Sequence, residues 1–387
     1  MKLIPFGLPS INKEEINAVK RVIESKWIGS GPITQNFEKK FNKYKKSKYS
    51  LSVNSCTAGL HLSLIVLGIK KGDEVITTPL TFCSTINSIL MVGAKPVLVD
   101  INKETLNLDE TKIIEKITKK TKALMVVHYA GLPCDMYPIL KIAKKYKLKV
   151  IEDCAHAIES KYYNKNVGNF GETGCHSFYA TKNLTTGEGG MITTNNKKIS
   201  TRLNILRLHG ISKDAWKRYL PQNVSPKRKF EHYDVKEIGH KYNMTDLSAA
   251  MGLVQLKKLD KNWKLRKKIY EYYSEKLKHL PVLLQKIDRY PVKHAYHLFT
   301  LIIDTNKTKK KRDKLIAFLK KEKITTGVNY RSVTDMTLYK KILGWNSKTC
   351  KNGNYVGRNT ISLPLYPTLK KNEMIYICKK VCKFFEK

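Results

Sequence analysis

Lys182 is the residue of this sequence whose setting most favours chemistry. It precedes a glycine-rich turn at residues 187–190 and is the only lysine between Asn166 and Asn196. The average lysine content of the chain would place about five in a segment of that length, and charged amines are rarely fully buried, so the gap indicates side chains that face a core or a site. Burial lowers the pKa of an amine and favours nucleophilic and proton-transfer chemistry. A solvent-exposed loop lysine is the alternative.

A second segment, residues 54–64, has the pattern of an anion site. A short polar stretch with Ser55 and Thr57 leads into an apolar helical pattern. Free backbone N–H groups and a hydroxyl then converge at a helix N-terminus, which suits a phosphate group. The alternative is that Ser55 or Thr57 only caps the helix.

The third candidate is Asp153, which ends an apolar run at residues 149–153. A carboxylate there could keep a pyridine nitrogen protonated and so make an aromatic ring an electron sink. It could equally cap a helix or bind a metal. No cluster of histidines and cysteines accompanies it, so we predict that the protein has no metal site.

These residues must be positioned by alternating strands and helices. Apolar, β-branched runs occur at residues 73–77, 96–100, 123–127 and 149–153, with a helical pattern at 139–146 between the last two. Such alternation predicts βαβ units and a mostly parallel sheet. Because ligands bind at the carboxyl ends of parallel strands, we expect Asp100, His128 and Asp153 to lie at the ligand-binding edge.

The second half of the chain has a different pattern of apolar and polar residues. A polar stretch from Leu220 to His240 predicts a long loop, and a helical pattern then runs from Thr245 to about His279. A strand at residues 297–303 and a final helix follow. We therefore expect an α/β protein with a large domain at residues 1–255, including an N-terminal arm, and a small C-terminal α+β domain at residues 256–387.

The formal net charge of +41 raises the question of a nucleic-acid partner. Lysines outnumber arginines by 63 to ten, and they are spread along most of the chain without zinc-finger or basic-zipper spacing. Arginine is the better reader of bases and phosphates. We favour a solvated basic surface that attracts an anionic substrate over a surface that binds nucleic acid.

Compartment and membrane association follow from what the sequence lacks. No apolar run reaches the length of a membrane span, and residues 1–7 have no signal-peptide core. The eight cysteines are not spaced as a disulfide framework. The sequence therefore predicts a cytoplasmic protein with no membrane partner.

Taken together, the helix-start site, Phe82, Asp153 and Lys182 occur in the order seen in fold-type I pyridoxal-phosphate (PLP) enzymes. From residues 27–32 to residues 358–365, the chain resembles the DegT/DnrJ/EryC1/StrS family of sugar aminotransferases. Within that family it looks most similar to the enzyme that makes UDP-4-amino-4-deoxy-L-arabinose. The matching segments are Ser55-Cys56-Thr57-Ala58-Gly59, Val127-His128-Tyr129-Ala130-Gly131, Glu152-Asp153-Cys154-Ala155-His156-Ala157, His209-Gly210 and Tyr242-Asn243-Met244-Thr245-Asp246.

The resemblance implies a fold-type I architecture, with helices on both faces of the sheet, and a PLP cofactor. It implies that Lys182 holds the cofactor as a Schiff base, that Asp153 pairs with the pyridinium nitrogen and that His156 lies beside the phenolic oxygen. Asn243 would reach across from a second subunit, so a homodimer with shared active sites is implied. The other implied cofactor contacts are stacking by Phe82, where close relatives often carry Trp, and phosphate binding by Thr57, Ala58, Ser177 and Asn243.

Two residues are candidates for binding the substrate. Arg331 lies in the segment Asn329-Tyr330-Arg331, where many members of the family have a histidine-containing segment that helps to bind the sugar nucleotide. Its guanidinium suits a pyrophosphate, although a surface arginine fits equally well. Ser30, within residues 27–32 where the resemblance begins, is the other candidate.

The activity implied by the resemblance is transfer of an amino group from L-glutamate to a nucleotide-diphospho-4-keto sugar, which leaves 2-oxoglutarate. Some members of the family replace the lysine with histidine and dehydrate sugars, so Lys182 favours transamination. A 3-keto sugar or an inositol-type ketone is an alternative substrate. An alternative of another class is a regulatory or nucleic-acid-binding relative without catalysis.

Overall fold

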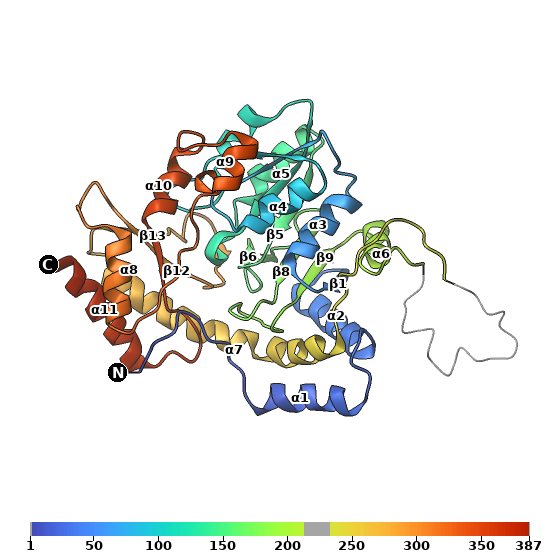
Figure 1. The fold of residues 1–387 in the computed structure, drawn as a ribbon, viewed down its shortest axis with the longest axis horizontal. Coiled ribbons are helices and arrows are strands. Elements are labelled where there is room, and N and C mark those ends of the chain that lie inside the picture. The colour runs from blue at the N-terminus through green and yellow to red at the C-terminus, as the bar shows by residue number, and fades with distance from the viewer. Residues whose placement is uncertain (1, 213–232, 387) are drawn as a thin grey trace, which may run out of the picture.

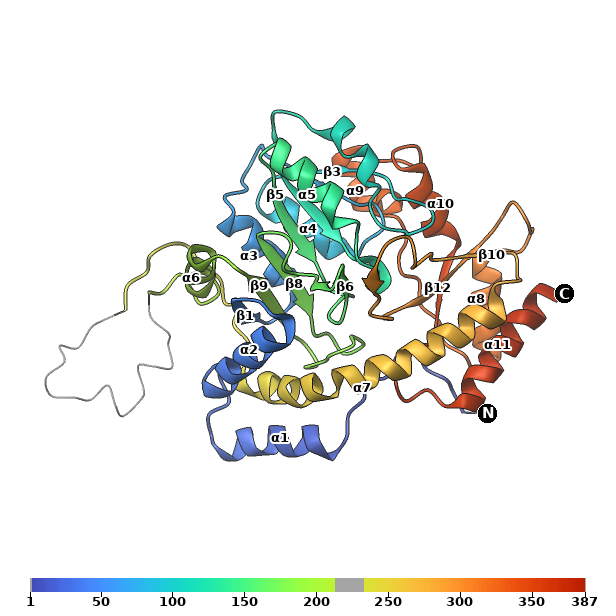
Figure 2. The ribbon, with the colours of Figure 1, turned by 180° about the vertical axis from the view of Figure 1, so that it is seen from behind.

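The computed structural model describes residues 2–212 and 233–386 (Figure 1). They form a large lobe around a seven-stranded sheet and a small lobe around a three-stranded sheet (Figures 1 and 2). Most of the loop predicted at residues 220–240 lies outside the described residues.

The central sheet has the strand order β1-β9-β8-β5-β4-β2-β3. Neighbours from β8 to β3 are parallel, whereas β9 is antiparallel to both β1 and β8. The prediction of a mostly parallel sheet is confirmed, and the four predicted runs form its strands β2 to β5. The strands are β1 (Tyr49–Val53), β2 (Glu74–Thr77), β3 (Lys95–Leu98), β4 (Thr121–Val127), β5 (Lys149–Asp153), β8 (Thr173–Ser177) and β9 (Gly190–Thr194).

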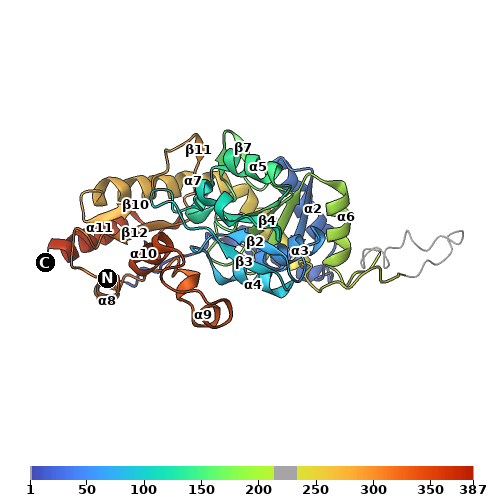
Figure 3. The ribbon, with the colours of Figure 1, turned by 90° about the horizontal axis from the view of Figure 1, so that it is seen from above.

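Helices cover both faces of this sheet, which is why its central strands are apolar on both sides. In β4, Ala123 and Met125 pack into the core that includes α3, and Leu124 and Val126 pack into the core that includes α5. The predicted arrangement of helices on both faces is confirmed (Figure 3). The helices of this lobe are α1 (Lys13–Glu24), α2 (Pro32–Lys45), α3 (Cys56–Val66), α4 (Cys83–Met91), α5 (Met136–Lys145) and α6 (Lys197–Leu206).

Helix α7 (Asp246–Leu277) runs from the large lobe to the small one (Figure 2). Its first residue also fixes α2, because the Asp246 carboxylate accepts hydrogen bonds from Gly31 N (2.8 Å) and Thr34 N (2.9 Å) at the start of that helix. The predicted domain boundary after residue 255 falls within this continuous helix, and the division into two domains stays a prediction. Among the described residues, no helix is long and apolar enough to cross a membrane.

The small lobe packs three antiparallel strands, in the order β10-β12-β13, against α7, α8 and α11. The predicted strand at residues 297–303 forms β12, and the final helix forms α11. The elements of this region are β10 (Val282–Leu284), β12 (Phe299–Ile303), α8 (Arg312–Lys321), α9 (Thr337–Leu343), α10 (Lys351–Asn359), β13 (Thr360–Leu363) and α11 (Lys371–Glu386). A separate small sheet joins β11 (Val292–Lys293) to the hairpin of β6 (Lys161–Tyr162) and β7 (Lys165–Asn166).

The N-terminal segment packs into the small lobe. Ile4 is 1% exposed and belongs to the same core as residues of α11 and β13. Its backbone pairs with the chain around Ile324, through Ile4 N to Lys323 O (2.8 Å) and Thr325 N to Ile4 O (2.9 Å). The first residues of the chain therefore contact some of the last.

We expect Ile4→Ala to lower the free energy of unfolding by about 2–5 kcal/mol, because it leaves a cavity in the small-lobe core. The matched control is Leu3→Ala at the neighbouring position, where the side chain is 62% exposed, and its effect should stay within about 0.5 kcal/mol. Urea unfolding of both variants measures the difference. Equal effects would contradict this placement of the N-terminal segment.

Candidate active site

A cavity of about 520 Å³ lies at the carboxyl edge of the parallel strands. Side chains from α3, α4, β5 and β8 line it together with residues of the small lobe. Six residues singled out from the sequence line this one cavity: Thr57, Phe82, Asp153, His156, Ser177 and Lys182.

The N-terminus of α3 lies at one side of the cavity. Ser55 is the N-cap, and its hydroxyl oxygen accepts a hydrogen bond from Ala58 N (3.1 Å). The backbone N–H groups of Cys56 and Thr57 have no acceptor within the helix, and both residues line the cavity. Gly190 allows this approach, because a Cβ there would lie 2.7 Å from the backbone of Ser55. Free N–H groups and the hydroxyls of Thr57 and Ser177 suit a phosphate.

Asp153 ends β5 and is 4% exposed. Its carboxylate accepts hydrogen bonds from Thr85 Oγ1 (3.0 Å) and Ala155 N (3.1 Å). Burial raises the pKa of Asp153, although these hydrogen bonds and the charge of Lys182 oppose the shift. A cationic N–H group placed against this carboxylate would stabilise its ionised form.

Lys182 is held by a turn in which its backbone N–H donates to Tyr179 O (2.9 Å). The side chain is half-buried because it opens into the cavity. Protein surrounds it on its other sides, and this desolvation lowers the pKa of Lys182 to about 8, against the opposing effects of Cys56 and Asp153. The solvent-exposed alternative is therefore not what the structure shows. An amine with such a pKa is partly unprotonated near neutral pH and can act as a nucleophile.

His156 and Tyr330 form the wall next to Phe82. The Ala130 N–H donates to His156 Nδ1 (3.2 Å), so the proton of this imidazole is on Nε2, which lies 2.8 Å from the Tyr330 hydroxyl. Burial holds the pKa of His156 well below its usual value, with the charge of Lys182 adding to the shift. The Tyr330 ring also lies 5.9 Å from that of Phe82. Tyr330 precedes Arg331, the candidate that the sequence analysis took from this segment. Nothing in the sequence indicates that Tyr330, and not Arg331, lines the cavity.

Four predicted site residues do not line this cavity. Ala58 is buried, does not line the cavity, and gives its N–H to Ser55. Arg331 is exposed and donates to Asp335 O (3.2 Å). Ser30 and Asn243 line a second cavity, of about 600 Å³.

Of the three residues expected at the carboxyl edge, only Asp153 lines the cavity. The Asp100 carboxylate instead accepts hydrogen bonds from Asn352 N and Gly353 N, each 2.8 Å away, at the start of α10. It therefore joins the small lobe to the sheet.

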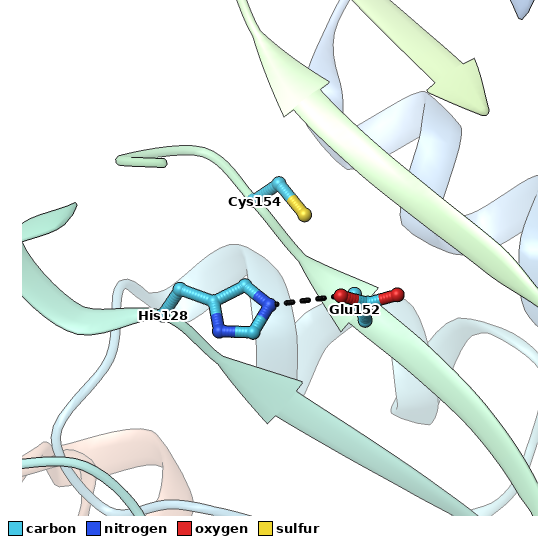
Figure 4. A group of neighbouring side chains, drawn as sticks. All are labelled: His128, Glu152 and Cys154. Atoms are coloured by element: carbon cyan, nitrogen blue, oxygen red, sulfur yellow. Dashed lines mark hydrogen bonds and ion pairs between the residues drawn. The ribbon is translucent and has the colours of Figure 1, made fainter. Parts of the chain in front are cut away.

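His128 lies behind the cavity, where it forms a buried group with Glu152 and Cys154 (Figure 4). Cys134 N donates to His128 Nδ1 (3.0 Å), so His128 Nε2 carries the proton and donates to Glu152 (3.1 Å). Both imidazole nitrogens are therefore used, and burial raises the pKa of the Cys154 thiol. Hydrogen bonds therefore occupy both His128 nitrogens and the Glu152 oxygen that faces them.

Glu152 accepts hydrogen bonds from other donors besides His128. Backbone N–H groups of Gly168, Phe170 and Gly171 donate to its two oxygens at 2.7–2.8 Å. Burial by itself would raise the pKa of Glu152, but the hydrogen bonds from His128 and from these backbone groups outweigh it and hold the pKa below its usual value. Glu152 thereby fixes the loop between β7 and β8.

The cavity fits PLP in three respects. Free N–H groups and hydroxyls at one side suit the phosphate, the buried Asp153 carboxylate suits the pyridinium nitrogen, and the Lys182 amine suits the aldehyde. The Phe82 side chain is 55% exposed at the rim and offers a flat apolar face.

Comparisons with known proteins show the family of the chain. Residues 9–382 match the DegT/DnrJ/EryC1/StrS aminotransferase family. The chain is 47% identical over 381 residues to the uncharacterized protein MJ1066 of Methanocaldococcus jannaschii, covering 98% of this chain and 97% of that one. It is 42% identical over 372 residues to the spore coat polysaccharide biosynthesis protein SpsC of Bacillus subtilis, covering 96% and 94%.

A solved structure is similar along the whole chain. The putative sugar aminotransferase Spr1654 from Streptococcus pneumoniae, in its PMP form, superposes with a TM-score of 0.91 at 30% identity and with 99% of each chain covered. The PLP form of the same protein gives a TM-score of 0.90.

We expect Glu152→Gln to destabilise the protein by about 3–5 kcal/mol, because an amide N–H₂ replaces an oxygen that accepts from buried donors. Chemical denaturation measures the change. Glu115→Gln, at an exposed carboxylate, is the control and should change stability by less than about 0.5 kcal/mol. A neutral effect of Glu152→Gln would contradict the role of Glu152 as the acceptor for this loop.

We also expect the unfolding midpoint of the wild-type protein to be the same in EDTA and in added Zn²⁺. A ligand that binds the folded state raises its stability, so a midpoint that rises with Zn²⁺ and falls with EDTA would contradict the account of the His128, Glu152 and Cys154 group.

Proposed function

The chain belongs to the DegT/DnrJ/EryC1/StrS aminotransferase family and is a PLP-dependent sugar aminotransferase, and from this premise we propose that it moves an amino group from L-glutamate to a nucleotide-diphospho-4-keto sugar. The product would be a 4-amino-4-deoxy or 4-amino-4,6-dideoxy sugar. Amination of a 3-keto sugar or an inositol-type ketone is the alternative. A noncatalytic, nucleic-acid-binding role has no support from this cavity.

The observation that carries the proposal is that Lys182 and Asp153 line the same cavity. Burial moves the pKa of Lys182 down and that of Asp153 up, so each group is moved toward its neutral form. A binding protein would not need a desolvated amine, a buried carboxylate and a helix N-terminus around the same space.

PLP, when bound, supplies an aldehyde that reacts with amines and a ring that withdraws electrons. In our proposal Lys182 Nζ would hold the cofactor covalently, and its amine would serve as the base for the Cα proton of glutamate. Asp153, fixed by Thr85 and Ala155, keeps the ring nitrogen protonated. The N-terminus of α3, Thr57 and Ser177 would hold the phosphate, and His156 would lie beside the phenolic oxygen.

The substrate is proposed to be anionic because of the charge of the chain. A net charge of +41 attracts a nucleotide diphosphate over a longer range than any single contact. Arg331 and Ser30 stay the candidates for contacts to the sugar nucleotide. The similarity to SpsC, which is named for spore coat polysaccharide biosynthesis, supports a product that enters a polysaccharide. We place the reaction in the cytoplasm.

We further propose a homodimer with shared active sites. Asn243 lies outside the cavity of Lys182 in its own chain, and its Oδ1 is buried with no hydrogen-bond partner among the described residues. Helix α1 also exposes Ile16 (61%) and Ile23 (58%), which is consistent with a subunit interface nearby. A second subunit would bring its own Asn243 to the phosphate.

The direct test of the reaction is a panel of nucleotide 4-keto sugars, 3-keto sugars and an inositol-type ketone, incubated with PLP and L-glutamate. We expect 4-keto sugars to show the mass change of a carbonyl converted to an amine, and 2-oxoglutarate to form in equal amount. Amination of the other ketones alone would contradict the proposed position, and no amination with any ketone would contradict the proposed function.

Lys182→Ala should abolish this turnover. Borohydride treatment of the wild-type protein should attach the cofactor to the peptide that contains residue 182, and the variant should lack this label because no amine is left there. Lys379→Ala, at an exposed position of α11, is the control and should behave as wild type. A Lys182→Ala protein with full activity would rule out the assignment.

A mixing experiment tests the shared site. Lys182→Ala and Asn243→Ala are each expected to be poorly active alone. In a shared-site dimer, an equal mixture that exchanges subunits regains about a quarter of the intact sites, since half of the dimers are mixed and each of those has one intact site. If both residues of a site come from the same chain, mixing restores nothing.

A further inference from the structure

Three buried polar residues behind the turn of Lys182 connect to one another. Asn183, next in the chain to Lys182, is 5% exposed, and its Nδ2 donates to both carboxylate oxygens of Glu159 (2.9 and 3.1 Å) and to Ala295 O (2.9 Å). Asn183 Oδ1 lies 3.0 Å from His297 Nδ1. His297 in turn lines the cavity that contains Lys182.

The hydrogen bonds fix the orientation of the Asn183 amide. A carbonyl oxygen and an ionised carboxylate can only accept hydrogen bonds, so the N–H₂ group of Asn183 must face Ala295 and Glu159. Its oxygen then faces His297, and an oxygen acceptor requires that His297 Nδ1 carries the proton. In a neutral imidazole the other nitrogen, Nε2, then has the free lone pair.

His297 is neutral in this setting. Burial holds its pKa well below the usual value, and the positive charges of Lys182 and Arg266 add to the shift. The ring packs 4.5 Å from that of His156, whose proton is on Nε2. The two neighbouring imidazoles therefore have opposite tautomers, one that donates from Nε2 and one that accepts at Nε2.

Glu159 is the acidic end of this network. It is 1% exposed and lies in the segment that follows β5, the strand that ends at Asp153. Burial raises its pKa to about 7, against the opposing charge of Arg266 and the hydrogen bond from Asn183. The titratable and charged groups that interact with it are Tyr44 and Lys45 on α2, Arg266 on α7 and Lys293 on β11.

We propose that Glu159 is a positioning residue for the transamination: by orienting Asn183 it keeps the unprotonated Nε2 of His297 available to the cavity that holds Lys182. There Nε2 accepts a hydrogen bond from a donor at the reacting centre, either the Lys182 ammonium or a hydroxyl group of the sugar. The role in turnover rests on the proposed function, whereas the tautomer of His297 does not.

Glu159→Gln tests the network with little change in shape. Both carboxylate oxygens lie within hydrogen-bond distance of the same Asn183 nitrogen, so the substitution brings one N–H₂ group against another. We expect Asn183 to lose its fixed orientation and kcat to fall by about 10- to 100-fold, with KM changed less than kcat. Glu15→Gln is the matched control, because Glu15 is also 1% exposed and accepts from Gln255 and Lys258 but is on α1.

The tautomer is measured without activity, by ¹⁵N NMR of histidine-labelled apoprotein at about pH 8, with the His297 signals assigned from a His297→Gln sample. We expect the Nδ1–H tautomer in the wild-type protein and in Glu15→Gln, and a mixture of tautomers in Glu159→Gln. A wild-type His297 protonated on Nε2 or on both nitrogens would overturn the proposal, even if Glu159→Gln does not fold. An unchanged tautomer and kcat in a folded Glu159→Gln protein would also overturn it.

The two proposals fail differently. The expected tautomers in a protein that aminates no ketone would overturn the proposed function and support the orientation of His297 by Glu159 and Asn183. Transamination with an Nε2–H tautomer of His297 would do the opposite.

The stability of the apoprotein gives a second measurement. The folded protein holds the proton of Glu159 up to about pH 7, whereas the usual pKa is 4.5. The stability from this proton is present below the unfolded pKa and is lost as pH rises through the folded one. We therefore expect the Tm of Glu159→Gln to rise relative to the wild-type Tm between about pH 5 and pH 8. A constant difference in Tm would contradict the buried, titrating carboxyl.

Discussion

The interaction on which the site depends is between two groups that burial pushes in opposite directions. Lys182 loses affinity for its proton and Asp153 gains affinity when both are removed from water. The attraction between their charges limits both shifts. An amine that can be neutral and an acid that can be ionised are therefore kept in one cavity at neutral pH. Strand β5 and the turn after β8 supply the two groups because neighbouring parallel strands end at the same edge of the sheet.

The alternation of side chains along β5 separates chemistry from support. Glu152 and Asp153 are adjacent, so their side chains point to opposite faces of the strand. Asp153 faces the cavity, and Glu152 faces the far side, where it accepts hydrogen bonds from His128 and a loop. A shift of one residue in this strand would exchange the two roles. Such a shift is prevented because both faces of the sheet are packed against helices. It would move every side chain of the strand to the opposite face.

The sequence predicted the elements that carry the site better than it predicted the contacts between them. The apolar runs identified β2 to β5, and the lysine gap identified Lys182, because burial leaves a direct mark on composition. The positions of lysines do not always mark exposed segments, since Lys45 is fully buried and donates to Ile158 O (2.8 Å). Tyr330, Glu159 and His297 were not found, because their positions depend on how distant segments of the chain meet. Ser30 and Asn243 line another cavity, and the sequence offers no measure of how far they lie from Lys182.

The N-terminus of α3 shows why two interpretations of one motif need not exclude each other. Capping and anion binding were treated as alternatives at residues 54–64, but a helix has several N–H groups without internal acceptors. Ser55 satisfies the N–H of Ala58, in the third position of the helix. The N–H groups of Cys56 and Thr57, in the same first turn, are left for a ligand. The Ser55 cap thus holds the first turn of α3 in the helical conformation. In that conformation the remaining N–H donors are positioned to bind a phosphate.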